Sequence, residues 1–341
     1  MGMILDKPRV LFCTLTISSQ KATSPLFKKK IKMSQEPAAA AANPLEVEKA
    51  PYDRTKIVSL PDLKLNESND DFPNVRGYLQ SYGYLKPTEG STADPATLDE
   101  EASNAIKLFQ TFTQLPQSGE LDSATRKELG SDRCGVVDPP VDPLAFEVRN
   151  PWHKRSLSYK VSKTSAQPQL TEAVCKAAIR RAFRTWSQAG VGLSFTEVED
   201  LTEDADIVVE WRPAADPDHN MVGGTIAHAD FPKRPLVSRG VAQAVGPTLP
   251  VHFDDVEHNW ADGAVVGAHD IETVAVHEIG HCLGMMHSTV RGSVMYFAIA
   301  TNTTKRRLTA DDLEGINTLY PPPSPVVVAE DEQKADGEKL P

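Results

Sequence analysis

The chain has 341 residues, of which 40% are hydrophobic, and this is enough to bury the cores of two domains. Its formal net charge of -11 argues against a nucleic-acid partner, because binding to phosphates requires a basic surface. No apolar run approaches the roughly 20 residues of a membrane-spanning helix, so no membrane span is predicted.

Residues 1–65 are predicted to form a flexible leader. A short apolar stretch at 10–17 follows two basic residues and is a weak candidate for a secretory signal. The lysine cluster at 28–32 is typical of a solvated tail. The alanine-, proline- and glutamate-rich segment at 34–64 has no sustained apolar period, which favours a flexible chain.

Residues 66–138 are predicted to form a small all-α bundle, because apolar side chains recur there at helical spacing. Ser123 suits the N-cap of a third short helix. The segment 139–150 is interrupted by prolines and poor in apolar residues, as expected of an exposed, cleavable linker. The periodic positions are Val75, Tyr78, Leu79, Tyr82 and Leu85, followed by Ala102, Ala105, Ile106, Phe109 and Phe112.

Residues 145–321 are predicted to form an α+β domain. Alternating apolar residues indicate strands at 157–161, 191–195 and 207–209. Between the first two, a helix carries Cys175 on its apolar face. The four cysteines show no paired framework, so no disulfide is predicted, and Cys175 and Cys282 are expected to be packed thiols. The proline-rich, acidic segment 322–341 is predicted to be disordered.

The segment HEIGHCLGMMH, which begins at His277, has the spacing of a hydrolytic zinc centre. His277 and His281 lie one helical turn apart and can bind one ion. Gly284 suits a left-handed cap that turns the chain sharply and brings His287 round as the third ligand. Three histidines leave a fourth position for water, as in catalytic zinc sites. Glu278 can reach that water and is the candidate general base.

The residues after this segment resemble the metzincins, whose zinc helix is followed by a methionine turn. Met295, in the sequence SVMY at 293–296, matches that methionine. The segment 308–320 is similar to the closing helix of the matrixins, the matrix metalloproteinase family. At 297–299, Phe-Ala-Ile stands where that family usually has Pro-x-Tyr in the wall of its main specificity pocket, so a collagen or gelatin preference is not carried over.

The hexapeptide RCGVVD, which begins at Arg133, resembles the matrixin cysteine switch, PRCGVPD. The resemblance implies that the thiolate of Cys134 occupies the open zinc position and that Arg133 pairs with Asp138. Asp132 and Val137 replace two family prolines that would stiffen the segment, so weaker latency and some basal activity are expected. The preceding bundle resembles the peptidoglycan-binding-like propeptide of this family.

The segments GGTIAHA and VHFDDVE resemble the structural zinc and calcium segments of the family. The resemblance implies a second, closed zinc site with His228 and His252 as ligands and Asp218 as a third. The fourth ligand stays open between His219, which is the more zinc-like donor, and Asp216.

Four acidic residues supply hard oxygens suited to calcium by the same resemblance: Asp206, Asp254, Asp255 and Glu257. The remaining histidines match no ligand position and are expected to be solvated: His153, His258 and His269.

The sequence therefore predicts a zincin-type catalytic domain, a twisted mixed sheet with about three helices, preceded by an all-α propeptide. The resemblance implies a latent zinc endopeptidase, monomeric and extracellular, that acts on proteins or peptides and carries two zinc ions and calcium. Two alternatives stay open. One is a non-catalytic protein that binds cell-wall or extracellular-matrix glycans through its bundle and has a degenerate peptidase domain, and the other is a zinc amidase that acts on wall peptides.

Overall fold

The computed structural model describes residues 51–86, 94–139, 149–233, 237–238, 241–242 and 248–322. Their apolar side chains form two clusters, one made by the N-terminal helices together with Tyr296 and Phe297 and one within the following α+β domain. The weak signal and Cys13 fall outside the described residues, as do most of the predicted linker and nearly all of the acidic tail.

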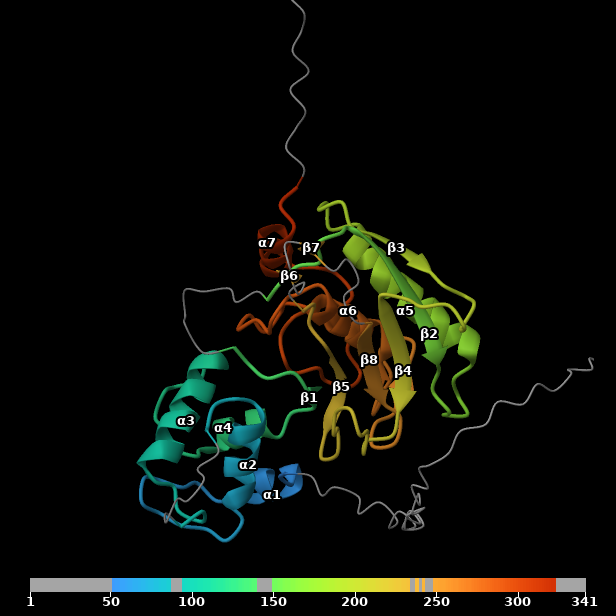
Figure 1. Ribbon diagram of the computed structural model, residues 1–341. Helices are drawn as coiled ribbons and strands as arrows, with labels where there is room; N and C mark the ends of the chain where they lie inside the picture. Colours follow the sequence, from blue (N-terminus) through green and yellow to red (C-terminus); the bar gives the residue numbers. More distant parts are fainter. Residues whose placement is uncertain are drawn as a thin grey trace, which may run out of the picture. The chain divides into compact units, whose positions relative to one another are not determined.

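Four short helices form the N-terminal bundle: α1 (Arg54–Ser59), α2 (Pro73–Ser81), α3 (Glu100–Phe112) and α4 (Ser123–Leu129) (Figure 1). Three of them begin after an aspartate whose carboxylate accepts a backbone N–H of the first turn. At α4 this cap is Asp122, whereas Ser123, the predicted cap, is the first helical residue. Aromatic rings fill the core, and Tyr78 meets Phe109 edge to face with ring centroids 5.8 Å apart.

The predicted boundary of the leader at residue 65 is wrong, because helix α1 and several buried residues lie before it. Tyr52, Ile57, Leu60 and Leu63 are all buried in the bundle core. Helix α1 has only six residues, which is too short for a 3.6-residue period to appear in the sequence. Its apolar side becomes evident only through packing against the other helices.

A six-stranded sheet with the order β1-β5-β8-β4-β2-β3 forms the framework of the second domain. Only the β5/β8 pair is antiparallel, so the sheet is mixed, as predicted. Strand β3 (Ser194–Glu197) begins later than the alternation at 191–195 suggests. Val191 and Leu193 lie just before this strand and are buried. The strands are β1 (Arg133–Cys134), β2 (Ser156–Lys163), β3 (Ser194–Glu197), β4 (Ile207–Arg212), β5 (Thr225–Ala229) and β8 (Leu249–Asp254).

Two small ribbons lie outside this sheet. Strands β6 (Val237–Ser238) and β7 (Val241–Ala242) pair antiparallel, and β9 (Trp260–Ala261) pairs with β10 (His269–Asp270).

Three helices complete the domain, as predicted: α5 (Glu172–Ser187), α6 (Ile271–Cys282) and α7 (Ala310–Leu319). Trp186 of α5 is fully buried, and its indole N–H donates to the carbonyl of Val276 in α6 at 2.8 Å. All twelve residues of α6 are buried, so this helix runs through the core of the domain. Cys175 and Cys282 are fully buried free thiols.

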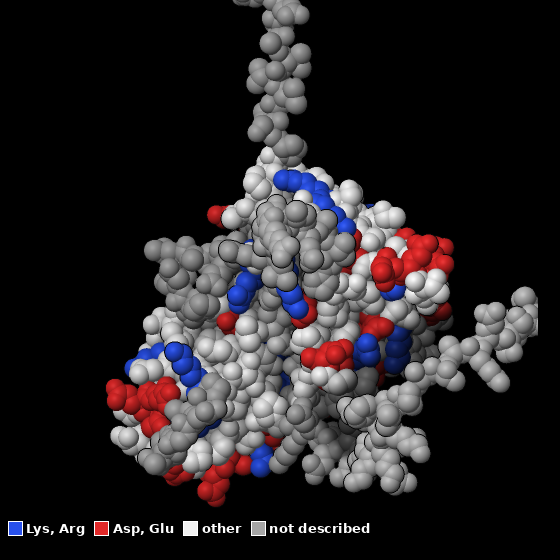
Figure 2. Space-filling view, viewed as in Figure 1, with Lys and Arg blue, Asp and Glu red and all other residues white. Residues whose placement is uncertain are grey.

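Acidic and basic side chains are intermixed on the face shown in Figure 2. In the part of the chain that the structure describes, no helix is long and apolar enough to cross a membrane.

Candidate metal centre

Helix α6 brings two histidines together at the centre of the domain. The side chain of Asp270 caps its N-terminus by accepting the N–H of Thr273 at 3.0 Å. One turn apart, the Nε2 atoms of His277 and His281 lie 3.2 Å from each other, and both rings are completely buried. Burial lowers the pKa of both imidazoles well below the ordinary value, so their lone pairs are free for a cation.

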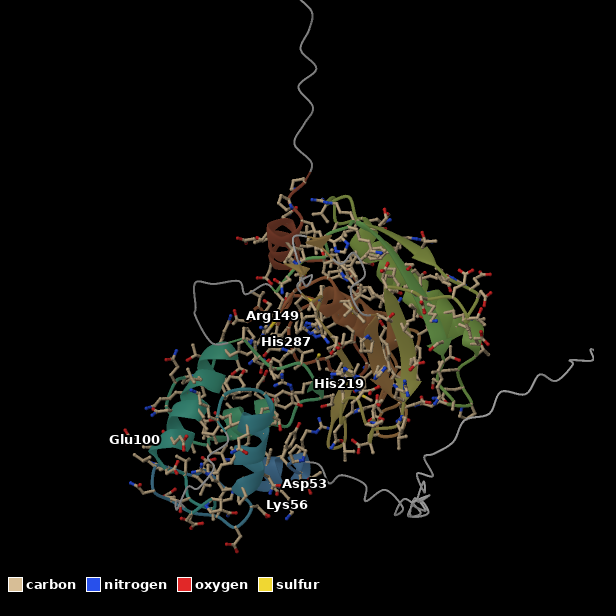
Figure 3. The ribbon with its side chains drawn as sticks, viewed as in Figure 1. Asp53, Lys56, Glu100, Arg149, His219 and His287 are labelled. Atoms are coloured by element: carbon tan, nitrogen blue, oxygen red, sulfur yellow. The ribbon has the colours of Figure 1, made fainter. Side chains whose placement is uncertain are left out.

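The chain turns at Gly284 and carries a third imidazole to the same point. The φ angle of this glycine is +101°, and a Cβ there would lie 2.7 Å from the carbonyl oxygen of Asn150. After the turn, Nε2 of His287, which is labelled in Figure 3, comes near α6. It lies 3.2 Å from Nε2 of His281. Gly284 is therefore required both by its left-handed conformation and by close contact with the backbone.

The outward nitrogens of these rings are fixed by backbone carbonyls. Nδ1 of His277 lies 2.8 Å from the oxygen of Val294, and Nδ1 of His281 lies 2.7 Å from that of Met285. Such contacts orient metal-binding histidines so that Nε2 points to the ion. Met295 packs beneath the helix, where a Cβ at Gly280 would overlap its sulfur.

Glu278 lies beside the three rings and is fully buried. Burial raises the pKa of its carboxyl group to about 8, and its Oε1 has no hydrogen-bond partner. A cation among the adjacent imidazoles would favour the ionised form, since nearby metal charge reverses the effect of burial.

Cys134 completes the group of donors. Its Sγ is buried and lies 3.5 Å from Nε2 of His281 and 3.5 Å from Oε2 of Glu278. One donor atom from each of Cys134, His277, His281 and His287 falls within 4.8 Å of every other, which matches a tetrahedral ligand set.

The backbone around Cys134 is held from two sides. Strand β1 pairs in parallel with β5, and the N–H of Gly135 donates to the carbonyl of Ala227 at 2.8 Å. On the other side, the N–H of Cys134 donates to the carbonyl of Phe297 at 3.0 Å. The segment therefore lies between the sheet edge and residues 297–299.

Arg133 and Asp138 form a buried bidentate ion pair, with N–O distances of 2.9 and 3.0 Å. The guanidinium carbon lies 3.4 Å from the ring centroid of Tyr82 and 4.6 Å from that of Phe297. Burial acts to raise the pKa of Asp138, but the charge of Arg133 prevails and holds it at about 2. Asp138 also lies 2.7 Å from Nδ1 of His287, so the segment contacts the histidine cluster through a carboxylate as well as a thiol.

A second cluster of histidines lies at the junction of β5 and β8. The rings of His219 (labelled in Figure 3) and His228 stack with centroids 3.6 Å apart. Nε2 of His228 lies 3.2 Å from Nδ1 of His252. Asp216 is buried, and its Oδ2 lies 2.6 Å from the same nitrogen of His252. Asp218 is exposed and falls in one group with Asp216 and His252. Both candidates for the fourth ligand, His219 and Asp216, thus lie at this cluster.

The four acids predicted to bind calcium do not form a single cage of ligands. Among the described residues, only Asp254 and Glu257 share a group of potential metal ligands. The carboxylate of Asp206 accepts the backbone N–H of Ser158 at 2.7 Å and pairs with Lys154 at 2.7 Å. Asp255 accepts the hydroxyl of Ser165 and the N–H of Ala166. The carboxylates of Asp206 and Asp255 thus already have protein partners, and the sequence pattern did not indicate these contacts.

The expectation that three remaining histidines are solvated holds only for His153, which is exposed. His258 and His269 are buried, with 8% and 1% of their surface exposed, and they lie in one group with Asp132. Strand pairing between β9 and β10 brings the two histidines together, and no local periodicity in the sequence indicates this contact.

Known proteins resemble this chain along most of its described length. A matrixin family model matches residues 151–321, and a peptidoglycan-binding domain model matches residues 68–129. Matrix metalloproteinase-19 of Homo sapiens is 32% identical over 263 residues, which cover 76% of this chain and 47% of that protein. Metalloendoproteinase 1-MMP of Arabidopsis thaliana is 32% identical over 277 residues, which cover 77% of this chain and 72% of that protein. The hatching enzyme of Paracentrotus lividus is 35% identical over 259 residues, which cover 75% of this chain and 39% of that protein.

The chain thus spans about half the length of the first of these relatives, 47%, and a larger share of the plant protein, 72%. The residues matched by the family model, 151–321, include both histidine clusters and Met295. The chain belongs to the matrixin family of zinc metalloproteinases.

Proposed function

We propose that this protein is a latent zinc endopeptidase that is inhibited by its own N-terminal segment. The observation that carries the proposal is the placement of Cys134 Sγ among the three histidine donors, all within 4.8 Å. Neutral, buried imidazoles and one thiol form a donor set that suits Zn²⁺ better than calcium or magnesium. We call residues 132–138 the inhibitory segment. Residues 139–150 are the proposed linker whose cleavage releases this segment.

His277, His281 and His287 would hold the catalytic zinc. A bound zinc supplies Lewis acidity toward the scissile carbonyl and toward the attacking water. Glu278 takes a proton from that water and passes it to the leaving amine. Its carboxylate has a free oxygen for this task, because Oε1 has no hydrogen-bond partner within the protein. Asp138 fixes the ring of His287 through Nδ1 in the latent form.

We infer that peptide substrates bind in extended form along the free edge of β5. In the latent chain this edge is taken by β1, since Cys134 pairs with Ala227 in the parallel register. Residues 297–299, on the other side of this segment, are also engaged, because the backbone of Arg133 forms an isolated antiparallel β-bridge with that of Ala298. The inhibitory segment therefore uses the backbone groups that an added strand of substrate would use.

A cavity of about 540 Å³ is lined by the four residues that follow β5 in the chain and by two residues before β2: Asp230, Phe231, Pro232, Lys233, Arg149 and Asn150. The ring of Phe231 lies 5.3 Å from that of His281, so the cavity adjoins the catalytic histidines.

Contacts of the inhibitory segment offset the loss of the two family prolines. Asp132 forms an ion pair with Arg54 at 2.6 Å, and Arg133 lies between the rings of Tyr82 and Phe297. A proline stiffens a segment through the unfolded chain, whereas these contacts hold the folded one. We therefore propose that any basal activity of the intact chain is small.

Removal of metal provides the direct test of the proposed chemistry. After activation with a thiol-modifying reagent, the full chain is expected to cleave internal bonds of a peptide library, as measured by mass spectrometry of the products. A zinc chelator should abolish cleavage, and added Zn²⁺ should restore it, because the three histidines supply no reactivity alone. Cleavage that survives complete removal of zinc would contradict the proposal.

The second histidine cluster leads to an expected metal content. We propose that His219, His228 and His252, with the buried carboxylate of Asp216, hold a structural zinc, and that Asp254 and Glu257 contribute to calcium binding. His228→Ala should therefore lower the zinc content by one ion while the catalytic zinc stays. Calcium removal should lower the thermal midpoint of the wild type, because an ion that binds only the folded state stabilises it. Elemental analysis and thermal unfolding measure both effects, and an unchanged zinc content in His228→Ala would refute the second site.

The match of residues 68–129 to a peptidoglycan-binding domain supports a second candidate function, which is binding of a cell-wall or matrix glycan. Contacts between the bundle and the catalytic domain favour inhibition as the main role of the bundle. For example, the guanidinium of Arg291 pairs with the carboxylate of Glu128 in α4 at 3.0 Å. Secretion and a monomeric state are part of the same proposal. Pull-down of the full chain on insoluble wall glycan measures the alternative.

A further inference from the structure

The side chains of Asp132, His258 and His269 form a third group of potential ligands, separate from both zinc sites described above. One ligand atom from each lies within 4.8 Å of the other two. Asp132 comes from the inhibitory segment, whereas both histidines belong to the catalytic domain. The group therefore joins the two parts of the chain that must separate on activation.

The backbone holds all three residues in place. His269 lies in β10, directly opposite Trp260 of β9, and its N–H donates to the carbonyl of Asn259 at 2.8 Å. His258 is the residue just before Asn259. On the other side, the carbonyl of Asp132 accepts the N–H of Ile299 at 3.1 Å. The site is thus built on hydrogen-bonded elements.

Buried nitrogens without partners point to a missing ligand. Nε2 of His258 and both ring nitrogens of His269 make no hydrogen bond, although only 8% and 1% of these residues is exposed. Leaving a buried polar group unsatisfied is unfavourable, so three such atoms at one place call for compensation. Nε2 of His269 lies 3.3 Å from Oδ2 of Asp132, a distance typical of two donors on one tetrahedral ion.

The arrangement of the rings resembles that of the catalytic histidines. The centroids of His258 and His269 lie 5.2 Å apart with an interplanar angle of 69°. In the catalytic cluster the corresponding distances are 4.8 Å for His277 and His281 and 5.2 Å for His277 and His287. The spacing therefore suits two imidazoles that share one metal ion.

Charge also favours a cation at this point. Asp132 has a cationic partner in Arg54, and this ion pair favours the ionised carboxylate. Arg54 binds its Oδ1 at 2.6 Å, which leaves Oδ2 toward the histidines. Asp254 adds a second carboxylate, and its partnerless Oδ2 lies 4.0 Å from Nε2 of His258.

We propose that Asp132, His258 and His269 bind a further divalent transition-metal ion, Zn²⁺ by preference, that clamps the inhibitory segment to the catalytic domain. Two imidazoles and one carboxylate favour zinc over calcium or magnesium. The role of the clamp in latency rests on the proposed function, whereas binding of the ion does not. Asp132 stands where the related switch sequence has proline, so the clamp replaces a stiff residue with a metal bond.

The test compares zinc content of intact, full-length chains after equilibration with Zn²⁺ and removal of the excess. His269→Ala should carry one ion fewer than the wild type, and His281→Ala should lose a different one, so the double variant should lose two. His153→Ala, which removes an exposed histidine, should keep the wild-type content. Equal zinc content in wild type and a folded His269→Ala chain would overturn the proposal.

A milder variant covers the case in which His269→Ala does not fold. Asp132→Asn keeps the size of a side chain that is 30% exposed and removes one charged ligand, so zinc affinity at this site should fall about 10-fold or more. Added Zn²⁺ should also slow activation by a thiol reagent in the wild type and not in Asp132→Asn. Unchanged affinity in Asp132→Asn would count against the clamp. Missing peptidase activity together with the expected loss of zinc would instead refute only the proposed function.

Discussion

Glu278→Ala is expected to lower peptide cleavage by about 100-fold or more while the catalytic zinc stays bound, since general acid–base catalysis contributes roughly 10² to 10⁴. The reason lies in the geometry: Glu278 is buried beside the three histidines but is not one of the four grouped donors. His281→Ala should behave differently and lose the metal itself. Cleavage rates after thiol activation and zinc content, measured on the same preparations, separate the two effects.

The matched control for this experiment is Glu172→Ala. Glu172 is an exposed carboxylate in the first turn of α5, where it pairs with Lys176, and it lies on the helix that packs against α6. Its loss should leave both cleavage and zinc content close to wild type, because exposed ion pairs contribute little. Full activity in Glu278→Ala would rule out its role as the base.

Cys134→Ser should activate the uncut chain by at least about tenfold, which corresponds to ~1.4 kcal/mol or more of lost inhibition. Serine keeps the size of the side chain, but its hydroxyl stays protonated and is a far poorer zinc ligand than a thiolate. Burial and the nearby Glu278 raise the pKa of the Cys134 thiol well above its ordinary value. Bound zinc would reverse this, because a coordinating thiol is deprotonated. The switch therefore depends on the bound metal, because without it the buried thiol stays protonated.

Cys175→Ser serves as the control for this prediction, because Cys175 is a buried thiol on α5 that belongs to none of the grouped metal donors. It should give no activation. The measurement is the rate of peptide cleavage by the intact chain, with mass spectrometry showing that the linker is uncut. Wild type and Cys134→Ser that are equally active in this form would leave the bundle as a binding module.

Much of the catalytic centre follows from short-range rules that can be read from the order of residues. The spacing of His277 and His281 on a helix, the turn at Gly284 and the return of His287 depend on local backbone geometry, and Nε2 of His281 lies 3.2 Å from Nε2 of each of the other two histidines. The mixed sheet, the three catalytic-domain helices and the buried thiols of Cys175 and Cys282 follow equally from periodicity and composition.

Contacts between distant segments are a different matter. The hydrogen bond of Asp138 to His287 joins residues 149 positions apart, and Arg133 meets the rings of Tyr82 and Phe297 only because the bundle packs on the domain. His258 and His269 come together where β9 pairs with β10, and Asp132 joins them from a segment more than 120 positions earlier in the chain. Periodicity shows which face of an element is apolar, but it does not indicate which other element will cover that face. For this reason the candidate ligands on one helix could be named from their spacing, and Cys134, His228 and His252 could be named only through the family resemblance. The grouping of Asp132 with His258 and His269 required the folded chain.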